Sequence, residues 1–66
     1  MRVLINGEPK ELSEIIRLSE LMQRLDLPSQ RIAVEINKTV IRRKDWENTD
    51  VNDGDRIEVV HFVGGG

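Results

Sequence analysis

The 66-residue chain carries a net charge of −2 and contains no cysteine. Such a length makes one domain with a limited core, and without cysteine neither a disulfide nor a thiolate metal site can reinforce it. The ten basic residues are scattered along the chain, so no nucleic-acid partner is expected. No apolar run approaches the roughly 20 residues that span a membrane, and no signal-peptide pattern opens the chain, so we expect a cytoplasmic protein.

The first two predicted elements form a hairpin. Met1 to Asn6 reads as a strand, because Val3 to Ile5 are apolar and two of them are β-branched. Asn6-Gly7 follows, a pair that accepts the positive φ angles of a type I′ turn. Glu8 to Leu12 is predicted to return antiparallel, and Pro9 favours a position at the sheet edge because it lacks an N–H donor.

A single helix is predicted next. One apolar face has the spacing i, i+3, i+4 and i+7 of a helical period. Its members are Leu18, Leu21, Met22 and Leu25. We expect the helix to begin near Leu18, with an earlier turn capped by Ser13 as the alternative, and to end before Pro28.

Three more strands are predicted after the helix. Apolar residues alternate through Arg31 to Ile36, and Thr39 to Ile41 follows a short turn. Arg42 to Asp50 reads as a polar loop in which Trp46, half-buried, closes the end of the core. Arg56 to Val63 is the last strand, and its apolar residues occupy both parities.

The element order is therefore strand, strand, helix, then three strands. This order predicts an α+β fold, with a sheet of four to five strands and one helix packed on one face. We expect residues 1–63 to form the domain and residues 64–66 a flexible glycine tail. The predicted inward positions of the sheet are Val3, Ile5, Val34, Ile36, Ile57 and Val59.

No catalytic constellation is evident, so we do not expect an enzyme. His61 is the single histidine, which excludes multi-histidine and Cys/His metal sites. Asp50, Asp53 and Asp55 surround a glycine but lack the spacing of a calcium loop, and they read as turn formers. We therefore expect no bound metal and no bound cofactor.

The last three residues, Gly64, Gly65 and Gly66, are the strongest functional candidate. Glycines in a row do not favour stability, but three extended residues without side chains reach about 10 Å through a narrow channel. The terminal carboxylate, ionised at neutral pH, can attack the α-phosphate of a nucleotide held by another protein. An inert flexible end is the plain alternative.

A predicted apolar patch also indicates a protein partner. If Val3 and Ile57 face the helix, then Leu4, Val60 and Phe62 face the opposite side of the sheet. An exposed apolar patch of this kind is a docking candidate. Coverage by neighbouring side chains, or self-association, is the alternative.

In order and spacing, several segments resemble the ThiS family of thiamine-biosynthesis sulfur carriers, over essentially the whole chain. They are Val3-Leu4-Ile5-Asn6-Gly7, Glu20 to Leu25, Val34-Glu35-Ile36-Asn37, Val40-Ile41-Arg42-Arg43 with Trp46, Asp53 to Glu58, and Gly65-Gly66. The resemblance implies a ubiquitin-like β-grasp fold with a mixed sheet.

The resemblance also implies a reaction at Gly66. An E1-like, ThiF-like adenylyltransferase would adenylate its carboxylate with ATP and magnesium. A sulfur donor such as a cysteine desulfurase would convert it to a thiocarboxylate, and a ThiG-like thiazole synthase would take the sulfur. Gly65 is then the slender neighbour, and Gly64 a more variable tail position.

Three alternatives remain open at this point. The chain also fits a molybdopterin-synthase small subunit or another β-grasp sulfur carrier, although its shortness favours the thiamine pathway. A ubiquitin-like modifier would attach Gly66 to a lysine amine. A β-grasp interaction module with an inert tail is the alternative from a different class.

Overall fold

The computed structural model describes residues 1–27 and 31–61. Its first elements, β1 (Arg2–Ile5) and β2 (Glu8–Glu11), form the predicted antiparallel hairpin. Asn6 and Gly7 have φ angles of 50° and 83°, as a type I′ turn requires. β2 is the outermost strand of the sheet, so Pro9 lies at an edge and its missing N–H leaves no gap in the ladder.

The main sheet has five strands in the order β2-β1-β7-β4-β5. β4 (Ile32–Ile36) and β5 (Thr39–Ile41) form the second antiparallel hairpin, and β7 (Arg56–His61) lies between β1 and β4. β7 runs parallel to β1 and antiparallel to β4, which makes the sheet mixed. The strand that leads to the C-terminus therefore occupies the centre of the sheet.

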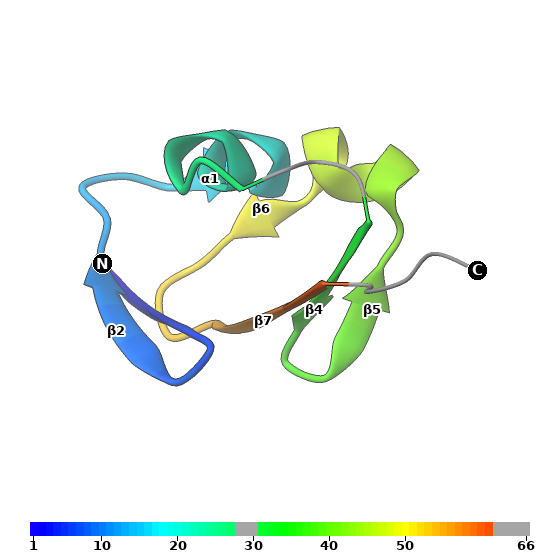
Figure 1. Ribbon diagram of the computed structural model, residues 1–66. Coiled ribbons are helices and arrows are strands. Elements are labelled where there is room, and N and C mark those ends of the chain that lie inside the picture. The colour runs from blue at the N-terminus through cyan, green and yellow to red at the C-terminus, as the bar shows by residue number, and fades with distance from the viewer. Residues whose placement is uncertain (28–30, 62–66) are drawn as a thin grey trace.

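The helix α1 (Leu18–Arg24) begins at the residue that the sequence predicts. It lies across one side of the sheet (Figure 1). Its last residue, Arg24, donates hydrogen bonds to the carboxylates of Glu20 and Glu14, and these bonds raise the pKa of Arg24. Pro28 lies outside the described residues; within them the chain leaves the helix earlier, and Asp26 has a φ of 54°.

The segment after β5 is polar, as expected, but the prediction that it contains no helix or strand was wrong. The 3₁₀ helix η1 (Arg43–Asn48) occupies it, followed by β6 (Asp50–Val51), which pairs with β3 (Ile16–Arg17) in a second, two-stranded sheet. The anchor of η1 is Trp46, which is 5% exposed rather than half-buried. Its Nε1–H donates to the carbonyl of Ile41 at 3.0 Å, so the indole is both packed and hydrogen-bonded.

The core lies between the five-stranded sheet and the layer formed by α1 and η1 (Figure 1). All six predicted inward positions of the sheet are buried, as are three of the four predicted helix positions; Leu25 is partly buried. The sequence interpretation missed some core members: Ile16, Ile32 and Val51. The described part of the chain has no buried side-chain polar atom without a hydrogen-bond partner.

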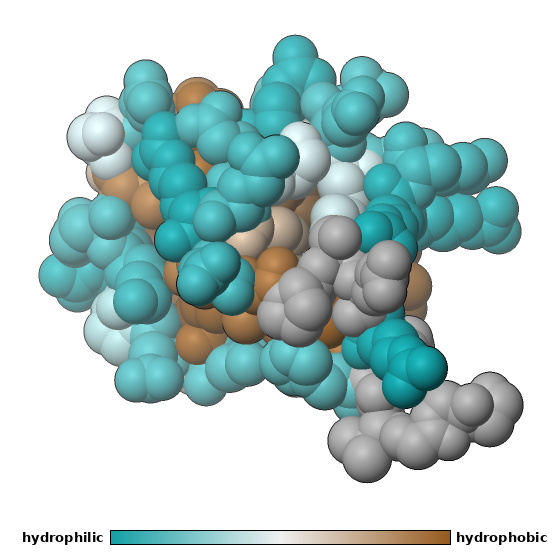
Figure 2. Space-filling model, turned by 45° about the horizontal axis from the view of Figure 1, so that its top comes forward, coloured by the Kyte–Doolittle hydropathy of each residue, from teal (hydrophilic) through white to brown (hydrophobic). Residues whose placement is uncertain are grey.

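The helical layer does not cover the core completely. Met1, Leu12, Leu25, Leu27 and Ile41 are only partly buried where they pack against it. Figure 2, which brings the helix-bearing side forward, shows hydrophobic atoms at the surface between hydrophilic side chains. Within residues 1–27 and 31–61, no helix has the length and hydropathy needed to cross a bilayer.

Candidate functional site

The end of β7 is the structural root of the predicted reactive tail. β7 is described as far as His61, whereas the tail residues Gly64, Gly65 and Gly66 and the docking candidate Phe62 lie outside the described residues. β4 pairs with β7 along its whole length, up to Ile32 opposite His61. β1 pairs with it only through Leu4 and Ile5, so the last residues of β7 have a neighbouring strand on one side only.

A side chain occupies the place where β1 is missing. Asn6 Oδ1 accepts a hydrogen bond from the backbone N–H of Val59 at 2.8 Å, and Asn6 Nδ2 donates to the carbonyl of Val59 at 3.3 Å. The backbone N–H of Asn6 donates to the carbonyl of Ile57 at 2.8 Å. One asparagine thus contacts β7 at two successive positions of its β1-facing edge.

The structure separates two of the predicted docking residues. Leu4 and Val60 both lie on the face opposite the helix, where Leu4 is partly buried and Val60 is 50% exposed. Leu4 stands beside Arg56 in the sheet register. Val60 is four residues further along β7, a distance of about 13 Å along a strand. They share a face of the sheet but do not form one compact patch.

The open face has an exposed apolar residue that the sequence interpretation missed. Val40 of β5 is 62% exposed and stands opposite Glu35. On the neighbouring strands, Ala33 of β4 stands opposite Val60 of β7. Val40 precedes Ile41, which faces the core. Because successive side chains of a strand point to opposite faces, this alternation could have predicted the outward position of Val40.

The predicted turn-forming carboxylates have structural partners. Asp53 Oδ1 accepts from the backbone N–H of Arg2 at 2.7 Å, and Asp55 Oδ2 accepts from the N–H of Asn52 at 2.8 Å. Asp50 differs from the prediction, because it lies in β6 and pairs with Arg17 at 3.1 Å. No cluster of three metal-ligating side chains occurs in the described ranges.

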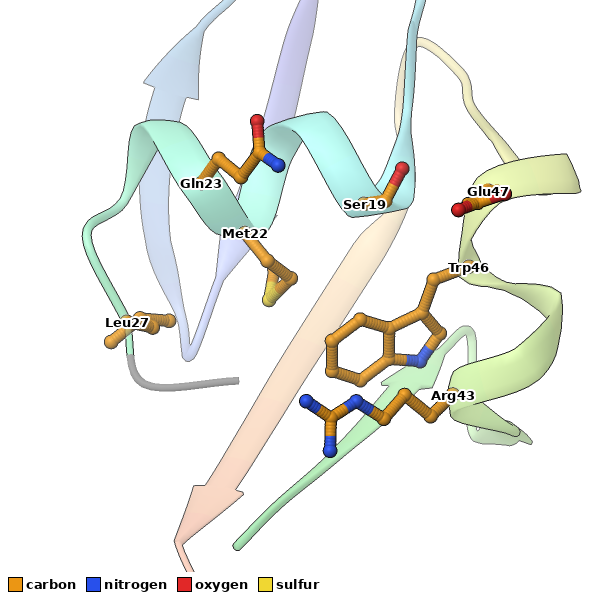
Figure 3. Close-up of a pocket in the computed structure, with 7 residues that line it drawn as sticks. All are labelled: Ser19, Met22, Gln23, Leu27, Arg43, Trp46 and Glu47. Atoms are coloured by element: carbon orange, nitrogen blue, oxygen red, sulfur yellow. The ribbon is translucent and has the colours of Figure 1, made fainter. Parts of the chain in front are cut away.

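A hollow lies between α1 and η1, with a volume of about 210 Å³. Met22 and Trp46 point toward one another across it, and Arg43 lies along the indole (Figure 3), with its guanidinium carbon 5.9 Å from the ring centroid. This volume is below that of typical ligand pockets, about 300–1,000 Å³. Its lining holds no histidine and no pair of groups suited to acid–base catalysis.

These features define a class of protein. The mixed five-stranded sheet with one α-helix packed on one face, and a central strand that is followed by a glycine end, is the ubiquitin-like β-grasp architecture. The model of the ThiS family matches residues 3–66. The chain therefore belongs to the ThiS family, and the resemblance read from the sequence is confirmed.

The similar proteins agree with this assignment. The chain is 44% identical to the ycf40 protein of Porphyra purpurea, covering 97% of this chain and 90% of that one. It is 29% identical to the sulfur carrier protein ThiS of Escherichia coli over the whole of both chains. It is also 36% identical, over its full length, to 20% of the thiazole synthase of Paramagnetospirillum magneticum.

A solved structure agrees as well. The crystal structure of the thiamine biosynthesis protein ThiS from Geobacter metallireducens superposes with a TM-score of 0.88. The two sequences are 33% identical, and the match covers 100% of each chain. The predicted α+β, ubiquitin-like β-grasp fold is thereby confirmed.

Proposed function

We propose that this chain is a sulfur carrier that works through the carboxylate of Gly66. The observation that carries this proposal is membership of the ThiS family by a chain whose central strand leads into Gly64-Gly65-Gly66. The described residues supply a stable platform without a catalytic constellation. In this role the chain would be the co-substrate of enzymes that act on its end, rather than an enzyme.

The first step is activation of the carboxylate by an E1-like adenylyltransferase, which would bind ATP and magnesium itself. A carboxylate oxygen of Gly66 attacks the α-phosphorus of ATP. The bond from that phosphorus to the β-phosphate oxygen breaks, and pyrophosphate leaves. The product is an acyl-adenylate, in which the acyl carbon has become electrophilic. Gly65 has no side chain, which allows this end to enter an enclosed site. The same requirement is weaker at Gly64, the more variable tail position.

The second step exchanges oxygen for sulfur. The persulfide of a cysteine desulfurase attacks the acyl carbon and AMP leaves with the bonding electron pair. A thiol then cleaves the resulting acyl disulfide, giving a thiocarboxylate on Gly66 and a disulfide between donor and thiol. Thiazole synthase would take the sulfur for thiamine thiazole. Support comes from the thiazole synthase relative that carries a segment similar to this chain.

Docking on these enzymes is proposed for the open face of the sheet. Among the residues that the structure describes, Val60 is the exposed apolar residue nearest in sequence to the tail. Phe62 lies two positions further along the sequence. Leu4 belongs to the same face, about 13 Å along the strands from Val60. A molybdopterin-type carrier or a ubiquitin-like modifier would use the same end with a different acceptor, and would be recognised by its product.

The test is pyrophosphate release by a purified ThiF-like adenylyltransferase with ATP and magnesium. The unaltered chain is expected to stimulate release, and deletion of Gly66 to abolish it while leaving the circular dichroism spectrum unchanged. A variant with one residue added after Gly66 controls for chain length, and it too should be inactive. Equal release by the deletion variant would refute the proposal, because the reacting group would then lie elsewhere.

A further inference from the structure

The Asn6 side chain continues a β-ladder that the backbone cannot. On the β1 side of β7, the N–H of Leu4 donates to the carbonyl of Asp55 at 3.0 Å, and the N–H of Asn6 donates to that of Ile57 at 2.8 Å. The chain then turns away at Gly7, whose φ is 83°. The next residue of β7 on this edge, Val59, is met by the carboxamide of Asn6, which accepts at 2.8 Å and donates at 3.3 Å.

A carboxamide is chemically a peptide group without its chain. It offers one carbonyl acceptor and an N–H donor in one plane, which are the two functions that a continuing β1 strand would present to Val59. The shorter bond has ordinary hydrogen-bond length and the longer one is weak. Asn6 therefore holds Val59 in sheet geometry beyond the end of the neighbouring strand.

The other end of β7 carries a matched arrangement. Asn37 also opens a hairpin turn, with a φ of 52° against 50° for Asn6. Its backbone N–H donates to the carbonyl of Arg56 at 2.7 Å, and its Oδ1 accepts from the N–H of Arg56 at 3.0 Å. The two asparagines differ in which end of β7 they hold. Arg56 is where the strand begins, whereas Val59 is seven residues before Gly66.

We propose that Asn6 is a positioning residue for the reaction at Gly66, an inference that rests on the proposed function. Without its side chain, the backbone of Val59 to His61 would have hydrogen-bonding partners on the β4 side only. Residues released from the sheet lose their fixed geometry, and they must be ordered again when the end enters an enzyme. That entropy cost falls on binding, so it raises KM and leaves the chemical step nearly unchanged.

Substitution by glycine at each asparagine isolates the side chain. Glycine adopts positive φ without strain, so Asn6→Gly and Asn37→Gly both keep their turns and lose only the carboxamide. In amide hydrogen exchange, Asn6→Gly should speed exchange of the Val59 N–H by about tenfold or more, the scale of one or two lost hydrogen bonds. Asn37→Gly should do so at Arg56 instead. An unchanged Val59 amide in Asn6→Gly would refute the inference.

The kinetic test uses the full chain, a ThiF-like adenylyltransferase, ATP and magnesium, at a temperature where every variant is folded by circular dichroism. Asn6→Gly should raise the KM for the carrier by about tenfold with kcat nearly unchanged, since the lost hydrogen bonds act on binding. Asn37→Gly, which loses a comparable contact at the far end, should leave KM close to that of the unaltered chain. Equal KM changes in both would overturn the positioning role.

Asn6→Asp provides a partial rescue. A carboxylate still accepts from the Val59 N–H but cannot donate to the Val59 carbonyl, so its KM should lie between those of Asn6→Gly and the unaltered chain. A KM no better than that of Asn6→Gly would contradict the role of the accepting bond. If the unaltered chain is itself not adenylated, the proposed function fails, and the exchange measurement still decides whether Asn6 holds the end of β7.

Discussion

The two faces of the sheet differ in what they do for the molecule. The face under α1 and η1, which we call the closed face, is apolar and mostly covered: Val3, Val34 and Ile57 are at most 1% exposed. On the opposite face, Val60 and Val40 are 50% and 62% exposed, and Glu35 and Glu58 stand opposite each other. One face carries the packed core of a 66-residue domain, and the other keeps exposed apolar side chains beside charged ones.

The largest expected effect is in the helix α1, which packs on the closed face. Leu21→Ala removes a side chain that is 1% exposed, and such a truncation costs about 2–5 kcal/mol. A core of this size supplies roughly 3–5 kcal/mol in total, so a large fraction of the variant should be unfolded at room temperature. Urea denaturation followed by circular dichroism measures this.

The matched truncation on the open face is Val60→Ala. Because half of Val60 is already exposed, its free energy of unfolding should change by about 0.5 kcal/mol or less. A loss as large as that of Leu21→Ala would mean that the open face contributes to the core, and the contrast between the faces would be wrong.

The next effect concerns the indole that closes the core beside η1. Trp46→Phe loses the hydrogen bond to the Ile41 carbonyl and leaves a small void, so the free energy of unfolding should fall by about 1–3 kcal/mol. Arg43→Ala, which removes the guanidinium over the ring together with its aliphatic stem, should cost no more than about 0.5–1 kcal/mol. The reverse order, found by the same denaturation experiment, would contradict the account of Trp46.

The sequence predicted the closed face well because alternation and helical spacing are local signals. Val3 and Ile5 stand two positions apart in one strand, the spacing that a half-buried strand requires. Leu18 marks the helix start correctly. The short pairing of Ile16 with Val51 was missed, because two-residue strands leave no periodicity to read. Trp46 was predicted to fill the end of the core. The helix η1 around it was not predicted, because it depends on tertiary contacts.

The candidate site was predictable only in part. Parity placed Leu4 and Val60 on the open face, but the distance between them depends on the parallel register of β1 against β7. Register between strands far apart in sequence is set by packing and not by local pattern. The contact of Asn6 with Val59 spans 53 residues, and Asn6-Gly7 had been interpreted only as a turn.

On the open face, a charge should affect docking and not folding. Val60→Asp should weaken binding to a ThiF-like adenylyltransferase by about tenfold, as expected for an interface residue of more than 1 kcal/mol. Val40→Asp makes the same change at an exposed residue two strands away. Isothermal titration calorimetry measures the dissociation constant of each variant, and Val40→Asp should change it less than Val60→Asp. Unchanged affinity for Val60→Asp would remove this residue from the docking surface.

The smallest expected effect is at the surface of α1. Glu20→Gln removes one charge partner of Arg24. Both side chains are exposed, so the free energy of unfolding should fall by less than in any of the variants above. The pKa of Arg24 should return toward its ordinary value because a negative charge is lost. A loss that persists in 1 M salt would show that the pair is not a screened surface contact.

The central claim is that this domain presents Gly66 for sulfur loading. Its most direct test is the intact mass of the chain after incubation with ATP, magnesium, a ThiF-like adenylyltransferase, a cysteine desulfurase, cysteine and a thiol reductant. The account predicts a mass increase equal to the difference between one sulfur and one oxygen atom, localised by fragmentation to Gly66. An unchanged mass, with the same enzymes active on another carrier, or a sulfur found on any other residue, would contradict it.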